Sequence, residues 1–327
     1  MPREGVELSH FQEPEELVRA VPGVVFRATA LRADPFDVSL TTIGLGDVCL
    51  QTGRSTPHVA FARAVSGTAI LQLPLENVDT LLLNGRDTPP RAVGLYGGGA
   101  ELIRSNLRDS SHAVLVLPMD SAEPLLCPPS SSPLLRPGAQ ALLKAGAQAW
   151  DQAVGVMQSA AAAAARTPRT FDTKQPREAL RDALLQAMRD LIAGAGGAGP
   201  SGGRYRPRTW RRIVLGADEY LRANVARPIY TEELCAALGI SASSLTDAYH
   251  ATFGLSPHRF LKLRRLIMVR SLLRSLEGPA RPVQSVALAH GFWHLGQFAI
   301  DYRAMYGEMP SETLAHARSA ATPGGLG

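Results

Sequence analysis

The spacing of apolar and polar residues changes along this 327-residue chain. Between residues 20 and 120, short stretches rich in Val, Leu, Ile and Thr alternate with Gly, Asp and Asn, which is typical of strands joined by turns. Strands are predicted at 24–31, 36–43, 69–75, 80–84 and 113–118, with a tight turn at 97–100. Several short strands at such intervals predict a barrel or a sandwich.

From Pro137 onward the apolar period becomes helical. One face of a helix that runs on through the alanines of 160–165 is predicted to hold Leu142, Leu143, Gly146, Ala149, Trp150, Ala153 and Met157. A second helix is predicted over 178–192. Two interpretations stay open: both helices cover the β domain, or they pair with another subunit.

A third pattern begins at residue 208 with an amphipathic helix over 208–225. Next comes a short helix with Thr231 as its N-cap, a turn at Gly239, and a longer helix opened by Ser241. This is helix-turn-helix spacing. The predicted core positions are Ile213, Leu215, Ala217, Tyr220 and Leu221 in the first helix, Leu234 and Leu238 in the second, and Leu245, Ala248, Tyr249 and Phe253 in the third.

The same pattern recurs about fifty residues later, with Gly291 at the turn. The inward positions of this second copy are Val286, Ala287, Leu295, Phe298, Tyr302 and Tyr306. Residues 258–274 between the copies are predicted to form one continuous helix. Two recognition helices held about 34 Å apart can enter successive major grooves on one face of a DNA duplex.

Charge separates the two parts of the chain. Residues 204–318 hold 16 Lys and Arg against 9 Asp and Glu, a net +7, which leaves −2 of the total of +5 for the remainder. A basic domain beside a near-neutral one favours a polyanion-binding module, although a basic surface without a partner has the same signature. The stretch AGAGGAGPSGG at 193–203 predicts a flexible linker. Its GxGxxG match at Gly194, Gly196 and Gly199 follows a helix, whereas a dinucleotide site requires a preceding strand.

The β domain lacks a recognisable catalytic or metal-binding motif. His58 and His112 do not stand in a metal-ligand arrangement, and Cys49, Cys127 and Cys235 are far apart with no CxxC pair. We therefore predict no catalytic residues, no metal and no cofactor, and we expect Cys49 to be a buried hydrophobe. A barrel interior can still bind a small apolar ligand. No apolar run reaches the ~20 residues of a membrane span, and the acidic, polar N-terminus is unlike a signal peptide, so the sequence predicts a cytoplasmic protein with no membrane partner.

Residues 210–318 resemble the DNA-binding domain of the AraC/XylS family of bacterial transcription regulators. The resemblance rests on Gly239-Ile240-Ser241 before the first recognition helix, the pair Arg265-Leu266, and AHGF at 289–292 with the G-x-x-P ending at Pro310. Residues 291–302 look especially like the subgroup that contains the ethanolamine-operon regulator. The resemblance implies an α+β protein, in which a cupin-like β barrel with two following helices precedes an all-α domain with two helix-turn-helix motifs joined by a long helix.

The domain boundaries follow from the linker and this resemblance. We predict an effector-sensing and dimerisation domain at 1–192, a linker at 193–207, the double helix-turn-helix domain at 208–318 and a disordered tail at 319–327.

The resemblance also implies which residues contact DNA. The base-reading positions are Ser243, Thr246 and Asp247 in the first recognition helix, and Leu295, Gly296, Ala299 and Ile300 in the second. The family usually has Arg where this chain has Asp247 and Ile300, so affinity should depend more on phosphate contacts. Those contacts are expected from Arg259, Lys262, Arg264 and Arg303. For Arg265 we favour an intradomain role, such as a contact to a helix end or a carboxylate.

The sequence thus predicts a regulator, not an enzyme, that binds double-stranded promoter DNA and responds to a small organic effector bound by its N-terminal domain without turnover. The resemblance favours an activator, which would contact RNA polymerase, and it is compatible with a homodimer. Two alternatives are a DNA-repair protein and a barrel enzyme, each fused to the same DNA-binding module. The first would need a reactive cysteine in a metal-ligating cluster, and Cys49 and Cys127 stand alone.

Overall fold

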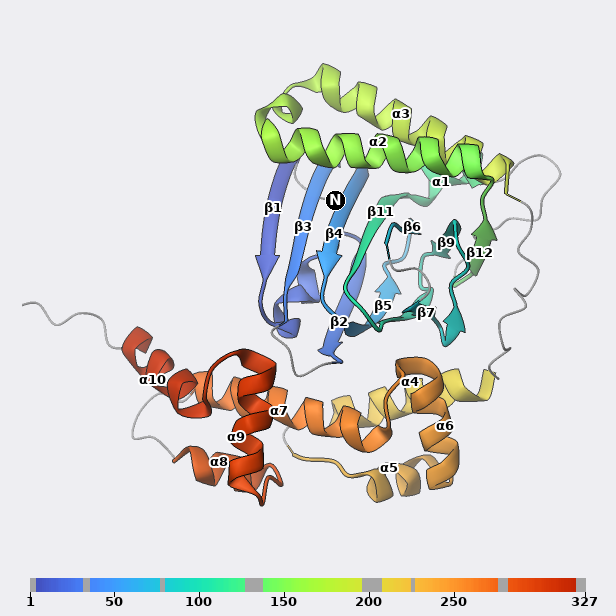
Figure 1. Ribbon diagram of the computed structural model, residues 1–327. Coiled ribbons are helices and arrows are strands. Elements are labelled where there is room, and N and C mark those ends of the chain that lie inside the picture. The colour runs from blue at the N-terminus through green and yellow to red at the C-terminus, as the bar shows by residue number, and fades with distance from the viewer. Residues whose placement is uncertain are drawn as a thin grey trace, which may run out of the picture. The chain divides into compact units, whose positions relative to one another are not determined.

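The computed structural model describes residues 4–31, 36–76, 80–126, 138–195, 208–224, 227–275 and 282–321, and the chain divides into two compact units. The first unit is built from β-strands followed by two long helices, and the second is helical (Figure 1). The predicted α+β fold class is therefore confirmed. Cys127, residues 196–207 of the predicted linker and residues 322–327 of the predicted tail lie outside the described residues.

Two antiparallel sheets form the first unit. The larger has the order β1 (Gly5–Phe11), β3 (Val38–Leu45), β4 (Val48–Ser55), β11 (Ser110–Pro118), β6 (Thr68–Pro74), β9 (Ala92–Gly97) and β12 (Gln140–Lys144). The smaller has the order β2 (Val24–Ala30), β5 (His58–Ala64), β10 (Glu101–Asn106), β7 (Leu81–Leu83) and β8 (Arg86–Asp87). Across the described strands the sheets remain separate, so the domain is a two-sheet form of the predicted cupin-like barrel. A short 3-10 helix, η1 (Pro14–Arg19), precedes β2, and α1 (Met119–Leu126) follows β11.

The strand β11 shows why its sequence is apolar at almost every position. Successive side chains of a strand point to opposite faces, and β11 lies between β4 and β6 with both faces covered. Leu115 and Leu117 join the core formed with the helices, whereas Val114 and Val116 join a separate cluster on the other face. Burial on both faces replaces the usual alternation of apolar and polar residues with a continuous apolar run.

The long helices α2 (Ala147–Arg166) and α3 (Lys174–Ala193) cover one face of the larger sheet (Figure 1). Ala153 and Met157 of α2, and Leu184 and Met188 of α3, share one buried core with residues of β3, β4, β6, β9 and β11. Of the two interpretations of these helices, the covering role is confirmed, and pairing with another subunit stays a prediction.

One prediction in this region was wrong. Leu142 and Leu143 belong to strand β12 rather than to a helix, and α2 begins only at Ala147. The strand pairs with β9, with Leu143 opposite Val93, and Leu143 is buried in the core that faces the helices. Both leucines fit the apolar spacing of the helix that follows them. Hydrogen bonding to the open edge of the sheet nevertheless made them part of a strand.

From Arg208 onward, the regular secondary structure of the described residues is helical. These are α4 (Arg208–Ala223), α5 (Thr231–Leu238), α6 (Ala242–Phe253), α7 (Pro257–Ser275), α8 (Val283–Ala289), α9 (Leu295–Tyr306) and α10 (Pro310–Ala321). The predicted continuous helix between the two motifs is confirmed as α7, and α10 continues to Ala321. The prediction for Thr231 was wrong by one residue, because Tyr230 occupies the N-cap position and makes no side-chain capping bond. Ser241 is the N-cap of α6, and its side chain accepts a hydrogen bond from the Ser244 amide at 3.2 Å.

Candidate functional site

Each helix-turn-helix motif turns at a glycine in the left-handed region. Gly239, after α5, has φ of +63°, and Gly291, after α8, has φ of +75°. Residues with a Cβ rarely adopt this conformation, so glycine permits the tight entry into α6 and α9. Space is also limiting at Gly291, because a Cβ there would collide with the phenol oxygen of Tyr230.

Aromatic side chains form the small core of each motif. In the first motif Tyr249 and Phe253 of α6 pack with Phe260 of α7, and their ring centres are 4.9–5.3 Å apart. In the second, Phe292 and Phe298 lie 4.9 Å apart, and Phe298 lies 5.7 Å from Tyr302. These contacts explain why 291–306 is rich in aromatic residues and poor in catalytic residue types: the side chains support α9.

Arg265 of α7 connects the two motifs. Its guanidinium carbon lies 5.1 Å from the ring centre of Tyr230 and 5.2 Å from that of Phe292, and the residue is only 7% exposed. The predicted intradomain role is confirmed, but the contact is made to aromatic rings rather than to a carboxylate or a helix end. A buried guanidinium over an aromatic face gains a cation–π attraction. Because a guanidinium is weakly hydrated, it can be removed from water to make this contact more easily than an ammonium group.

The seven predicted base-reading residues all retain contact with solvent. Ser243 and Asp247 of α6 are exposed and Thr246 is half-buried, while Gly296 and Ile300 of α9 are exposed and Leu295 and Ala299 are half-buried. Ile300 is 64% exposed although it is a large apolar residue. None of the seven is among the buried core residues, so part of each remains open to a partner. Their role in base reading stays a prediction.

The four residues predicted to contact phosphates differ in the contacts that they already make within the protein. Arg259 and Arg303 are exposed. Lys262 of α7 forms an ion pair with Asp301 of α9 at 2.5 Å. Arg264 donates a hydrogen bond from Nη2 to the Leu221 carbonyl at 2.5 Å, at the C-terminal end of α4, and burial lowers its pKa. A cation at the C-terminal end of a helix satisfies a free carbonyl and complements the helix dipole. Arg259 and Arg303 are therefore the two whose exposed side chains remain open to solvent, and the phosphate contacts of all four residues stay a prediction.

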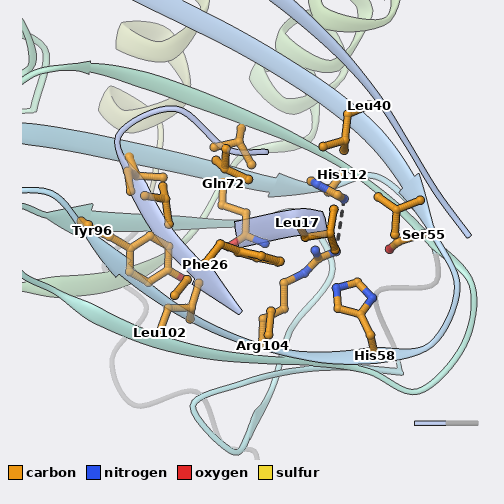
Figure 2. Close-up of a pocket in the computed structure, with 18 of the residues that line it drawn as sticks. Leu17, Phe26, Leu40, Ser55, His58, Gln72, Tyr96, Leu102, Arg104 and His112 are labelled. Carbon is orange, nitrogen blue, oxygen red and sulfur yellow. Dashed lines mark hydrogen bonds between the residues drawn. The ribbon is translucent and has the colours of Figure 1, made fainter. Parts of the chain in front are cut away.

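The first unit contains a cavity between its two sheets, with a volume of about 70 Å³. Most of the residues in its wall are apolar, among them Leu17 of η1, Phe26 of β2, Leu40 of β3 and Leu102 of β10 (Figure 2). The polar side chains of the wall are Ser55, His58, Gln72, Tyr96, Arg104 and His112. A mainly apolar cavity with a few convergent polar groups is the usual form of a small-molecule site.

Arg104 of β10 is a charged residue in this wall. It is 4% exposed, and its Nη2 donates to Ser110 Oγ and His112 Nδ1 over 3.4 Å in each case, longer than most hydrogen bonds. Its Nε has no hydrogen-bond partner among the described residues. Burial lowers the pKa of Arg104 to about 10, so the guanidinium stays charged at neutral pH.

The two histidines of the wall are buried and neutral. Burial, followed by the charge of Arg104, lowers the pKa of His58 to about 4 and that of His112 well below its usual value. His58 is oriented by a 2.8 Å contact between its Nδ1 and the Thr56 carbonyl, to which the ring donates. Both side chains are buried in the wall of the cavity. Among the described residues, no group of three His, Cys, Asp or Glu is close enough to hold a metal ion.

The sequence of the helical unit matches known DNA-binding proteins. Residues 234–316 match the family described as a helix-turn-helix domain. The XylDLEGF operon transcriptional activator of Pseudomonas putida is 32% identical over 106 residues, which are 32% of this chain and 32% of that protein. The solved structure of a probable AraC family transcriptional regulator from Rhodopseudomonas palustris is 43% identical and has a TM-score of 0.30, and the match covers 32% of this chain and 97% of that one. The chain belongs to the AraC/XylS family of transcriptional regulators.

The similarity to curated AraC/XylS regulators is confined to part of each protein. The probable thc operon regulatory protein of Rhodococcus erythropolis is 32% identical over 102 residues, or 31% of each chain. This chain thus spans about a third of the length of these two relatives, and 62% of the length of the XylDLEGF operon transcriptional activator 2 of Pseudomonas putida. The narrower resemblance to the ethanolamine-operon subgroup stays a prediction.

The alternative of a DNA-repair fusion requires a reactive cysteine, and Cys49 does not have the environment of one. Cys49 is 1% exposed, and burial raises the pKa of its thiol to about 12, which disfavours the reactive thiolate. None of the described helices is both long and apolar enough to cross a membrane.

Arg104 is the residue of interest that sequence reasoning missed. A signal for it exists in 101-ELIRSN-106, because a side chain two residues from Leu102 must point to the same face of the strand. An arginine in phase with buried residues is unusual and indicates a special environment. The sequence does not show what lies opposite that face, so the cavity itself could not be predicted.

Proposed function

We propose that this AraC/XylS regulator binds promoter DNA through α6 and α9 and senses a small organic effector in the cavity between its two sheets. The observation that carries the proposal is the pair of glycine-turned helix-turn-helix motifs on one connecting helix, in a chain whose other unit encloses a cavity with a buried cation.

The DNA-binding part rests on the geometry of α7. Its 19 residues correspond to about 28 Å at 1.5 Å per residue, which supports recognition helices spaced about one turn of B-DNA apart. The solvent-exposed positions of α6 are polar, with Ser243 and Asp247, whereas those of α9 include the apolar Ile300. We expect α6 to read base edges through hydrogen bonds and α9 to contact thymine methyl groups.

The effector-sensing part rests on the cavity, which offers an apolar interior with oriented polar groups. We expect binding without turnover, so that the ligand changes promoter occupancy or transcription. We also propose that the regulator is an activator that contacts RNA polymerase, because several relatives are named as operon activators. A homodimer formed through the N-terminal domain is compatible with this role.

The test uses the full chain and sheared genomic DNA. We expect selective recovery of sites in which two half-sites lie about 10.5 base pairs apart, with affinity falling steeply as salt rises. Ile300→Glu should weaken binding at least tenfold without lowering the thermal midpoint, because Ile300 is exposed. The matched control is Val65→Glu in the other unit, where Val65 is 44% exposed, and it should bind DNA normally. Recovery of genomic fragments no better than random DNA at moderate salt would contradict the proposal.

A further inference from the structure

We propose that the cavity between the sheets is a binding site for a compact organic carboxylate, held through the guanidinium of Arg104. The inference specifies the ligand class of the sensing pocket and in that respect rests on the function proposed above. It follows from the unbalanced charge of Arg104, the composition of the cavity wall and the size of the cavity.

Arg104 is a buried cation that has no anionic partner in the part of the chain that the structure describes. Among the described residues, none of those that line the cavity is Asp or Glu, and no carboxylate contributes to the electrostatic surroundings of Arg104. Its hydrogen bonds go to the neutral groups Ser110 and His112 at 3.4 Å. A buried charge is costly unless it is paired, and an arginine fork matches a carboxylate with two parallel hydrogen bonds. A carboxylate ligand would supply the missing partner.

The surroundings of Arg104 favour a single negative charge. His58 and His112 also line the cavity and are neutral, so one cation faces the ligand. A carboxylate matches that single charge, whereas a phosphate monoester would bring nearly two negative charges into an apolar wall. Figure 2 shows His58 and His112 beside Arg104, with Phe26, Leu102 and Tyr96 on the other side of it. The carboxylate would lie at the histidine end, and the body of the ligand would pack toward Phe26 and Leu102.

The size of the cavity limits the ligand further. Its volume of about 70 Å³ is on the order of five times the ~10–15 Å³ that one water molecule requires. A single ring or a short chain therefore fits, and a long fatty acid does not. Phe26, Leu40 and Leu102 supply the apolar contacts for such a body.

The experiment measures binding to the full-length protein in the absence of DNA. The probes are cyclohexanecarboxylate, phenylacetate and hexanoate, each compared with its own primary amide, together with dodecanoate and phenyl phosphate. Calorimetry and thermal shift should show that at least one compact carboxylate binds and raises the melting temperature. Its amide should bind at least tenfold more weakly, and dodecanoate and phenyl phosphate should also bind more weakly.

Substitutions of Arg104 separate a ligand-binding role from a structural one. Arg104→Met should weaken carboxylate binding at least thirtyfold and raise the melting temperature of the unliganded protein, because an unpaired buried charge is removed. A merely structural arginine would lower that temperature when replaced. Arg104→Lys keeps the charge but loses the fork and should bind three- to tenfold more weakly. The control Arg54→Met changes a side chain that is 78% exposed, and it should bind like the wild type.

Three results would overturn the inference: no carboxylate of the panel binds, the amides bind as tightly as the acids, or Arg104→Met binds carboxylates like the wild type. The comparison of acids with amides uses wild-type protein and therefore stands even if a variant does not fold. If promoter occupancy responds only to a non-carboxylate ligand, this inference fails and the proposed function survives. If a carboxylate binds through Arg104 but leaves promoter occupancy unchanged, the proposed sensing fails and the binding site survives.

Discussion

The guanidinium carbon of Arg265 lies 5.2 Å from the ring centre of Phe292, and the same guanidinium lies 5.1 Å from the ring centre of Tyr230. Tyr230 immediately precedes α5 of the first motif, and Phe292 follows α8 of the second. One buried cation on α7 therefore contacts an aromatic ring from each helix-turn-helix motif. This contact fixes the two motifs relative to each other, beyond what the connecting helix alone provides.

We expect Arg265→Met to destabilise the helical unit by about 2 kcal/mol, because a desolvated cation–π contact is worth about that much and here two rings share the cation. Affinity for an operator with both half-sites should fall more than affinity for either half-site alone. Urea unfolding measures the loss of stability. Binding titrations with the full operator and with each half-site alone measure the change in affinity. Arg212→Met, at an exposed position of α4, is the matched control. Equal losses on full and half operators would show that Arg265 does not couple the motifs.

The residues predicted to contact phosphates should affect DNA binding differently, according to the contacts that each already makes within the protein. Arg259→Gln should reduce the dependence of log affinity on log salt concentration by about 0.9, the contribution of one phosphate contact. Arg264→Gln should change this slope little and should lower the stability of the unit, because Arg264 caps the end of α4 through the Leu221 carbonyl. Binding titrations at several salt concentrations test both variants. If the slope changes as much for Arg264→Gln as for Arg259→Gln, Arg264 contacts a phosphate as the sequence predicted.

The apolar face of α9 should distinguish thymine through its methyl group. Ile300 is 64% exposed, and a single methyl contact should contribute about 1 kcal/mol or less. Replacing each operator thymine by uracil removes only that methyl, and one such replacement should weaken wild-type binding. Ile300→Ala or Ala299→Gly should remove the loss. If no uracil weakens wild-type binding, or if the loss persists in both variants, α9 is held by phosphate contacts alone.

The stability of the first unit should depend on pH through His58. Its pKa is lowered to about 4 in the folded state from 6.5, so the unfolded state binds more protons between these values. Stability is then fully present above about pH 6.5 and is lost as the pH falls toward 4, by about 3 kcal/mol for this residue. His58→Gln, whose side chain does not titrate in this range, should flatten that part of the curve.

Trp150 fluorescence reports on the first unit if Trp210 and Trp293 are changed to Phe, because Trp150 packs against the core beneath α2. Urea unfolding at a series of pH values then gives the slope for His58 and for His58→Gln. An identical slope in the two proteins would show that another group, such as the buried His112, dominates the acid sensitivity.

The helical unit could be predicted from its sequence because its structure is set by contacts between near neighbours. The glycines at 239 and 291, the N-cap Ser241 and the apolar spacing from Leu245 to Phe253 all act within one or two helical turns, and each was found as predicted. The error at Thr231 is a shift of a single residue at a helix end, where the local signal is weakest.

The β unit depended on tertiary structure. Leu142 and Leu143 fit a helical period locally, and only hydrogen bonding to β9 made them a strand. In the same way, the sequence determined that Arg104 shares a strand face with Leu102, since side chains alternate along any strand. The pairing of strands far apart in the chain decided that this face lines a cavity together with residues of η1, β2 and β3, and that no carboxylate among the described residues of the cavity wall faces the arginine. Residue periodicity does not record such distant contacts.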